Sequence, residues 1–217
     1  MIRTNSRSHA VLLEKFRIAL DKAENNPGIA RELKKIGYGP ERIEEGKVLL
    51  ESTWKIFDAN LKKKDEQSAL RTKFKLHKKQ MDSTFRNHRK RALIIFKNEP
   101  VMADKLAVKG KYPTDYQGWM DTMRKFYGNI VNDPEIQERC LRLNLTKKDA
   151  EAGLAGIRKM EDLAAKRMLA KGVSEDSTEK KDAAFAKLND WMSDFYGAGR
   201  LALKEEPKLL EALYKSA

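Results

Sequence analysis

The feature that most constrains the fold is an internal repeat. When the sequence is shifted by 107 positions, residues 25–50 (NNPGIARELKKIGYGPERIEEGKVLL) align without a gap with residues 132–157 (NDPEIQERCLRLNLTKKDAEAGLAGI). A second block, FKNEPVMADKLA at 96–107, aligns with LKEEPKLLEALY at 203–214 at the same offset. Prolines, glycines and apolar positions agree between the two copies. We infer that the chain contains one structural unit twice.

Each copy has the pattern of amphipathic helices, because its apolar residues recur at steps of three and four. We predict three longer and two short helices per copy, with prolines at helix starts and after helix ends. The predicted fold class is all-α. It is an antiparallel helical bundle built from two tandem repeats, 1–107 and 108–217, with pseudo-two-fold symmetry and packed as one continuous body.

The last long helix of each copy carries the predicted packing seam. Its seam positions are Phe74, Met81, Phe85, His88, Ala92 and Ile95 in the first copy, and Phe185, Leu188, Met192, Phe195, Gly199 and Ala202 in the second. An earlier helix places Gly46 and Gly153 at one repeat position on an apolar stripe. Because glycine lacks a side chain, we expect another backbone to pack closely there, and we favour this over a ligand site.

Composition narrows the class of protein. The chain is 41% hydrophobic and 35% charged, as is usual for a globular protein made of amphipathic helices. The longest apolar run, Ala92–Phe96, is too short to cross a bilayer, and residues 1–10 lack the apolar core of a secretory signal. The single cysteine excludes an internal disulfide. We therefore expect a cytoplasmic location.

A resemblance supports the predicted fold. GYGPERIEEGKVLLE together with WMSDFYGAGRLALKEEPKLLEAL resembles an uncharacterised bacterial family of all-helical proteins with the same two-copy layout. The similarity covers most of the chain and rests on the PERIEEG, WMSDF and PKLLEAL segments. No activity, cofactor or catalytic residue is assigned to that family, so the resemblance implies a fold and no function.

Charge is distributed unevenly between the copies. The net charge is +13, with 25 Lys and Arg against 14 Asp and Glu in residues 1–107, and 20 against 18 in residues 108–217. The excess follows one helix of the first copy. At about 100° per residue, five basic side chains lie opposite the seam. They are Lys75, Lys79, Arg86, Lys90 and Lys97, flanked by Arg71, Lys73, Arg89 and Arg91.

The second copy shows that this basic stripe is not needed to form the helix. Ser193, Tyr196, Gly197 and Ala198 stand where the first copy has Arg86, Arg89, Lys90 and Arg91. A long row of cations can follow phosphates, which predicts polyanion binding at the stripe. The alternative is a solvated face of a bundle, the usual meaning of a charge run. No aromatic residue interleaves the stripe, which disfavours recognition of single strands by base stacking.

Other kinds of site find little support. His77 and His88 lie eleven residues apart on one helix, about 16 Å, too far to share a metal ion. Cys140 aligns with Leu33, as a core residue would. No phosphate-binding loop, catalytic serine motif or zinc motif is present. We therefore predict no catalytic residue, no metal site and no cofactor.

Three functions remain compatible with the sequence. The first is a non-enzymatic helical scaffold or interaction protein with an unknown protein partner. The second is weak, sequence-independent binding of nucleic acid or another polyanion through Lys75, Lys79, Arg86, Lys90 and Lys97. The third is an enzyme or metal protein whose site forms only in three dimensions.

Overall fold

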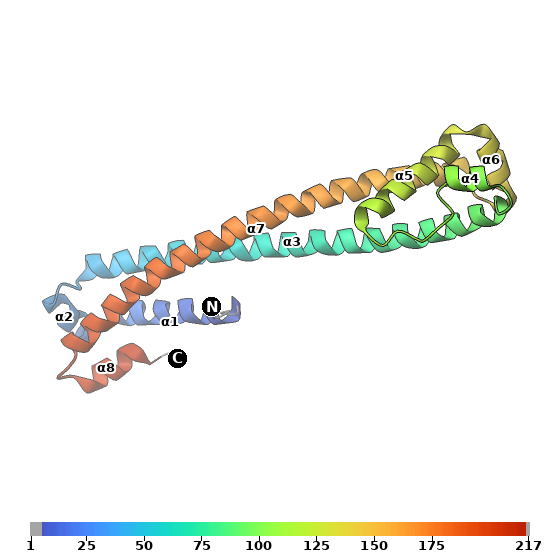
Figure 1. The fold of residues 1–217 in the computed structure, drawn as a ribbon. Helices are drawn as coiled ribbons and strands as arrows, with labels where there is room; N and C mark the ends of the chain where they lie inside the picture. The colour runs from blue at the N-terminus through green and yellow to red at the C-terminus, as the bar shows by residue number, and fades with distance from the viewer. Residues whose placement is uncertain (1–5, 216–217) are drawn as a thin grey trace. The chain divides into compact units, whose positions relative to one another are not determined.

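The computed structural model describes residues 6–215, which form helices and no strand (Figure 1). None of the helices in this range is both long and apolar enough to cross a membrane. The helices and their bounds are α1 Ser6–Asn25, α2 Pro27–Lys35, α3 Pro40–Ile95, α4 Pro100–Lys105, α5 Tyr116–Asn132, α6 Pro134–Cys140, the 3-10 helix η1 Leu141–Leu143, α7 Lys147–Ala202 and α8 Pro207–Tyr214.

Prolines and side-chain caps set the helix starts. Five of the six prolines are the first residue of a helix, where the missing N–H costs no hydrogen bond: Pro27, Pro40, Pro100, Pro134 and Pro207. Asn26 accepts hydrogen bonds from the backbone N–H groups of Gly28 and Ile29 at the start of α2. Thr146 and Asp149 bond each other's backbone N–H at the start of α7. These reciprocal bonds satisfy donors that a helix leaves unpaired.

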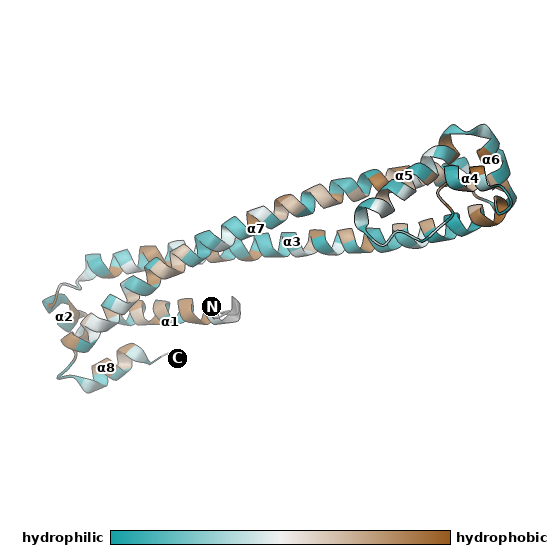
Figure 2. Cartoon of the chain, in the orientation of Figure 1, coloured by the Kyte–Doolittle hydropathy of each residue, from teal (hydrophilic) through white to brown (hydrophobic). Residues whose placement is uncertain are grey.

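Two longer helices, α3 and α7, replace the predicted pairs of separate helices. Each has 56 residues and continues without a break. The prediction of three longer helices per copy was therefore wrong by one, because two of them form a single helix. Residues 62–73 (KKKDEQSALRTK) contain neither glycine nor proline, and nothing in them ends a helix. Figure 2 shows apolar and hydrophilic residues alternating along both helices.

The chain divides into two compact units that do not coincide with the sequence repeats. Unit 1 contains residues 1–65 and 173–217, and unit 2 contains residues 66–172. The predicted boundary at 107/108 falls inside unit 2, and each unit takes one segment from each copy. Each hydrophobic core lies wholly within one unit.

In unit 1, α1, α2 and α8 pack with segments of α3 and α7. The core includes Leu13 and Leu20 of α1, Phe57 of α3, and Phe185 and Phe195 of α7, all buried. The rings of Phe57 and Phe185 meet edge to face at 6.0 Å. α2 and α8 close the unit against α1.

In unit 2, α5 supplies the largest group of core residues that cover α3 and α7. Phe126 and Tyr127 of α5 are fully buried, and both rings contact Phe85 of α3. The predicted seam residues Met81, Phe85, Ala92 and Ile95 are buried here. In unit 1 the same holds for the second copy's Phe185, Leu188, Met192, Phe195 and Gly199.

The two glycines of the shared stripe do allow close approach, but by side chains rather than backbone. Gly46 lies under the indole ring of Trp191 from α7. Gly153 lies under the phenol ring of Tyr127 from α5. The expectation of a backbone contact was therefore wrong, because the missing Cβ makes room for a flat ring at each position.

Candidate polyanion-binding surface

The five predicted stripe residues all belong to unit 2 and are exposed. Lys75, Lys79, Arg86 and Lys90 lie on α3. Lys97 lies two residues beyond the end of α3, in the turn that leads to α4. The α3 residues bracket the buried positions Met81, Phe85 and Ala92, which point to the core. The basic side chains therefore face solvent.

Arg86 differs from the lysines because it is already engaged. Its guanidinium bonds the Asp82 carboxylate at 2.7 Å and lies over the ring of Tyr112, 3.8 Å from the centroid. Tyr112 donates to Asp82 at 2.6 Å and accepts from Trp119 Nε1 at 2.9 Å. Burial acts to raise the pKa of Asp82, but the bonds from Arg86 and Tyr112 outweigh it and hold that pKa below its usual value. This network ties the loop before α5 to α3.

Two flanking arginines bond the backbone that follows a helix. Arg89 donates to the carbonyl oxygens of Ala107, Lys109 and Gly110, beyond the end of α4. Arg91 donates to the carbonyl oxygens of Leu143 and Asn144, at the end of η1. Ala107 and Asn144 have the left-handed backbone common after a helix C-terminus, where carbonyl groups lack helical partners. These cations stabilise the fold of unit 2.

Comparison of the two copies did not reveal the structural role of Arg89 and Arg91. The second copy has Tyr196 where the first has Arg89, so the alignment gave no sign that this arginine is structural. The useful signal in the sequence was the connection at 107–115, between α4 and α5, whose carbonyl groups Arg89 binds.

The cations left for a ligand are Lys75, Lys79, Lys90 and Lys97. Among the described residues, no carboxylate forms an ion pair with any of them. Lys78, on the flank toward the core, lies 5.7 Å from the ring centroids of Tyr116 and Trp119. The candidate surface is thus a row of lysines beside a layer of structural arginines.

The compact units concentrate the charge. Unit 2 contains 24 Lys and Arg against 13 Asp and Glu, a net charge of +11. Unit 1 contains 21 against 19, a net charge of +2. Unit 2 therefore gathers almost all of the protein's excess charge, and part of it comes from the second copy, which the sequence comparison assigned no role.

The added cations of unit 2 lie on α7. The first 26 residues of α7 belong to unit 2 and carry exposed basic side chains that the sequence analysis did not single out. They are Lys147, Lys148, Arg158, Lys159, Lys166, Arg167 and Lys171. Lys166 pairs with Asp162 at 2.8 Å, and the Arg167 guanidinium lies over Phe74. Dividing the chain at 107/108 separated these residues from the α3 stripe.

The two helical histidines have local packing roles. His77 Nε2 lies 3.0 Å from the Gly156 carbonyl oxygen, and His88 Nδ1 lies 3.2 Å from the Tyr127 hydroxyl. Burial lowers the pKa of His88, which favours the neutral ring. Each imidazole thus satisfies a polar group beside the unit 2 core.

Cys140 is a core residue with an unreactive thiol. It is fully buried, and desolvation raises its pKa to about 11. Since the thiolate is the nucleophile, a thiol with this pKa reacts slowly near neutral pH. Within residues 6–215, no three His, Cys, Asp or Glu side chains gather as metal ligands would.

The sequence was also compared with known proteins. No protein-family model, no curated protein and no solved structure matches it.

Proposed function

We propose that this protein is a non-enzymatic helical interaction protein, and that unit 2 binds polyanions such as nucleic acid without sequence preference. The observation that carries the proposal is the net charge of +11 in one compact unit beside +2 in the other. Cations placed along a surface displace the counterions of a polyanion, and this release drives binding.

The chemistry of the surface favours phosphates over bases. Its available groups are lysine ammonium ions, which are flexible point charges rather than rigid, planar hydrogen-bonding groups. Two aromatic residues near α3 are already engaged: Tyr112 accepts a hydrogen bond from Trp119, donates one to Asp82 and is covered by Arg86. They are therefore unsuited to stack on exposed bases. We expect affinity to follow charge density.

The test is binding of the full chain to a labelled DNA duplex, measured by fluorescence anisotropy over a range of salt. Four or five contacted phosphates predict a log–log slope near −4, at about −0.9 for each phosphate. The Lys75→Gln, Lys79→Gln, Lys90→Gln triple variant should flatten the slope by about three. Arg86 is left unchanged, because its bonds to Asp82 and Tyr112 would confuse stability with binding.

A matched triple variant in unit 1 controls for net charge. Lys15→Gln, Lys187→Gln and Lys204→Gln remove the same charge from exposed positions outside the surface. This control should leave the slope within about one of the original value. Equal weakening by both variants, or no binding near physiological salt, would contradict the proposal and show that the lysine row is only a solvated face.

The two copies in the sequence are proposed to be versions of one structural unit. Three pairs of helices support this, because they begin 107 residues apart: α2 and α6, α3 and α7, and α4 and α8. Each compact unit combines the first part of one copy with the last part of the other. The two copies would therefore have exchanged their last parts. We also propose a cytoplasmic location, on the basis of the single cysteine, which is a free thiol.

A further inference from the structure

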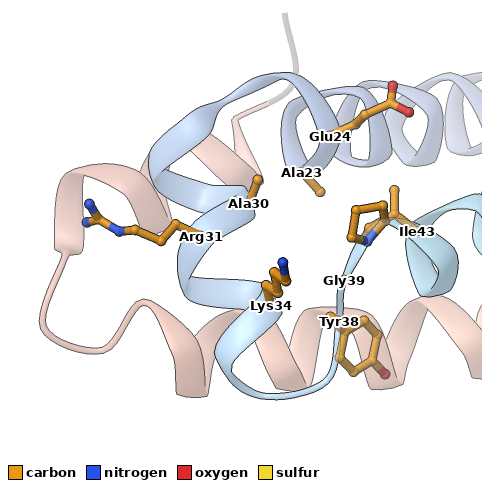
Figure 3. A pocket seen from close by; sticks show the side chains of 9 residues that line it. Ala23, Glu24, Ala30, Arg31, Lys34, Tyr38, Gly39 and Ile43 are labelled. Carbon is orange, nitrogen blue, oxygen red and sulfur yellow. The ribbon is translucent and has the colours of Figure 1, made fainter.

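A cavity of about 310 Å³ opens in unit 1, between the end of α1, α2 and the start of α3 (Figure 3). Its walls are mainly apolar. Ala23 and Ile43 are buried, while Ala30 and Tyr38 are half-buried. The lining residues are Ala23, Glu24, Ala30, Arg31, Lys34, Tyr38, Gly39, Pro40 and Ile43.

The arrangement of the helices does not by itself require this cavity. At the matching positions of the second copy, Ala23 is replaced by Ile130 and Ala30 by Gln137. Ile130 is fully buried in unit 2, and the Gln137 side chain donates to the Val131 carbonyl oxygen at 2.7 Å. The second copy thus carries larger side chains where the first has two alanines. These two alanines therefore contribute to the open space in unit 1.

The charged groups around the cavity differ in availability. Glu24 forms an ion pair with Lys47, and Arg31 bonds Glu32 at 2.9 Å. Lys34 has no ion-pair partner among the described residues, and its stem passes beside Gly39. In Figure 3 the Lys34 side chain lies between Ala30 and Tyr38, at the open centre of the lining residues. One available ammonium group therefore accompanies an apolar surface.

We propose that this cavity binds a small aliphatic carboxylate. Water in an apolar cavity lacks hydrogen-bond partners, so an alkyl chain that displaces it is favoured. The carboxylate would lie near the Lys34 ammonium, while the alkyl chain would contact Ala23, Ala30 and Ile43. At about 30 Å³ for each water-sized group, the cavity holds roughly ten non-hydrogen atoms. Octanoate, with eight carbons and two oxygens, has this size.

This site is independent of the proposed polyanion surface. Every lining residue belongs to unit 1, and the lysine row belongs to unit 2. The Lys75→Gln, Lys79→Gln, Lys90→Gln variant should therefore bind octanoate as the unchanged protein does. Failure of one proposal leaves the other standing.

The test is isothermal titration of the full chain with octanoate. We expect saturable binding of one octanoate per chain. Ala30→Leu fills the cavity and should weaken binding at least about tenfold, since it excludes much of the alkyl chain. Ala30→Gln introduces the residue found in the second copy and should act in the same direction. Thermal denaturation of each variant shows whether the fold is kept.

The contribution of the charge is tested separately. Lys34→Gln should weaken octanoate binding by about threefold, the size expected for an exposed ion pair. Octanol should bind to the unchanged protein with a similarly reduced affinity. Lys15→Gln, an exposed lysine of α1 outside the cavity, serves as the matched control and should change nothing. The proposal is overturned if octanoate fails to saturate, or if folded Ala30→Leu binds it as well as the unchanged protein.

Discussion

The indole ring of Trp191 covers Gly46 so closely that a Cβ atom at position 46 would overlap the ring. Trp191 has little freedom to move aside. Its ring stacks on Phe195 at 5.7 Å and 14°, and its edge meets Tyr38 at 6.2 Å. The packing of α3 against α7 in unit 1 therefore requires glycine at position 46.

Gly46→Ala should destabilise unit 1. The added methyl group meets a rigid ring, and overpacking of this kind costs about 1–3 kcal/mol. Gly172→Ala is the matched control, since Gly172 is an exposed residue of α7 with no atom near the position of an added Cβ. That change should stabilise by about 0.5–1 kcal/mol. Urea denaturation followed by tryptophan fluorescence compares the two variants. Equal effects on the free energy of unfolding would contradict the close packing of Trp191 on Gly46.

Arg89→Gln should destabilise unit 2 although it lies beside the exposed lysine row. The change removes hydrogen bonds from a charged group to three carbonyl oxygens, and we expect a loss of about 2–3 kcal/mol. Lys90→Gln, one residue away, should stay within about 0.5 kcal/mol because Lys90 is exposed.

Amide hydrogen exchange locates the effect of Arg89→Gln. Exchange at residues 106–110 should increase in this variant and not in Lys90→Gln. A normal exchange rate there, with reduced duplex binding, would instead identify Arg89 as part of the ligand surface.

The sequence allowed much of the local structure to be predicted, because its signals are local. Prolines marked helix starts such as Pro27 and Pro134, and apolar spacing identified buried residues such as Phe85 and Phe195. The absence of glycine and proline from residues 62–73 could have indicated one continuous helix. The prediction of two separate helices, one on each side of these residues, gave too little weight to that absence.

The composition of the units was harder to predict. Similarity between the two copies predicts which segments have the same structure, but it does not predict which segments pack together. The contacts place Phe57 of the first copy against Phe185 of the second, and Met81 of the first copy against Gly156 of the second. For the same reason, the sequence did not show that the basic residues of α7 share unit 2 with the lysine row of α3. Cavity size likewise depends on contacts across helices.

The stability of unit 2 should fall as the pH drops below about 6.5. Burial lowers the pKa of His88 in the folded chain, with Asp149 acting to raise it and Arg91 to lower it. As the pH falls through 6.5, the unfolded chain takes up a proton first, so unfolding becomes easier. The loss should continue until the pH reaches the lower folded pKa. Thermal denaturation between pH 8 and pH 5 measures this dependence.

His88→Phe separates the pH effect from packing. Phe195 stands at the matching position of the second copy. The change leaves the buried Tyr127 hydroxyl without its imidazole partner, which should cost about 1–3 kcal/mol. Adding Tyr127→Phe should recover part of that cost. Both variants should show a weaker pH dependence, to which His9 in unit 1 still contributes because burial also lowers its pKa. An unchanged dependence would exclude His88 as its source.

The fragment 66–172 should fold on its own, whereas residues 1–107 should not. The unit 2 core, from Met81 and Phe85 through Phe126 and Tyr127 to Met160, lies entirely within residues 66–172. Cutting the chain after residue 107 divides both cores instead, because each takes residues from both copies. Circular dichroism should show a cooperative thermal transition for 66–172 and none for 1–107.

Two further measurements sharpen this prediction. Mixing the fragments 1–107 and 108–217 should restore a cooperative transition, since together they supply every residue of both cores. The fragment 66–172 should also keep the salt-dependent duplex binding, because it carries the net charge of +11. Independent folding of 1–107, together with an unfolded 66–172, would show that the sequence copies rather than the compact units are the folding units.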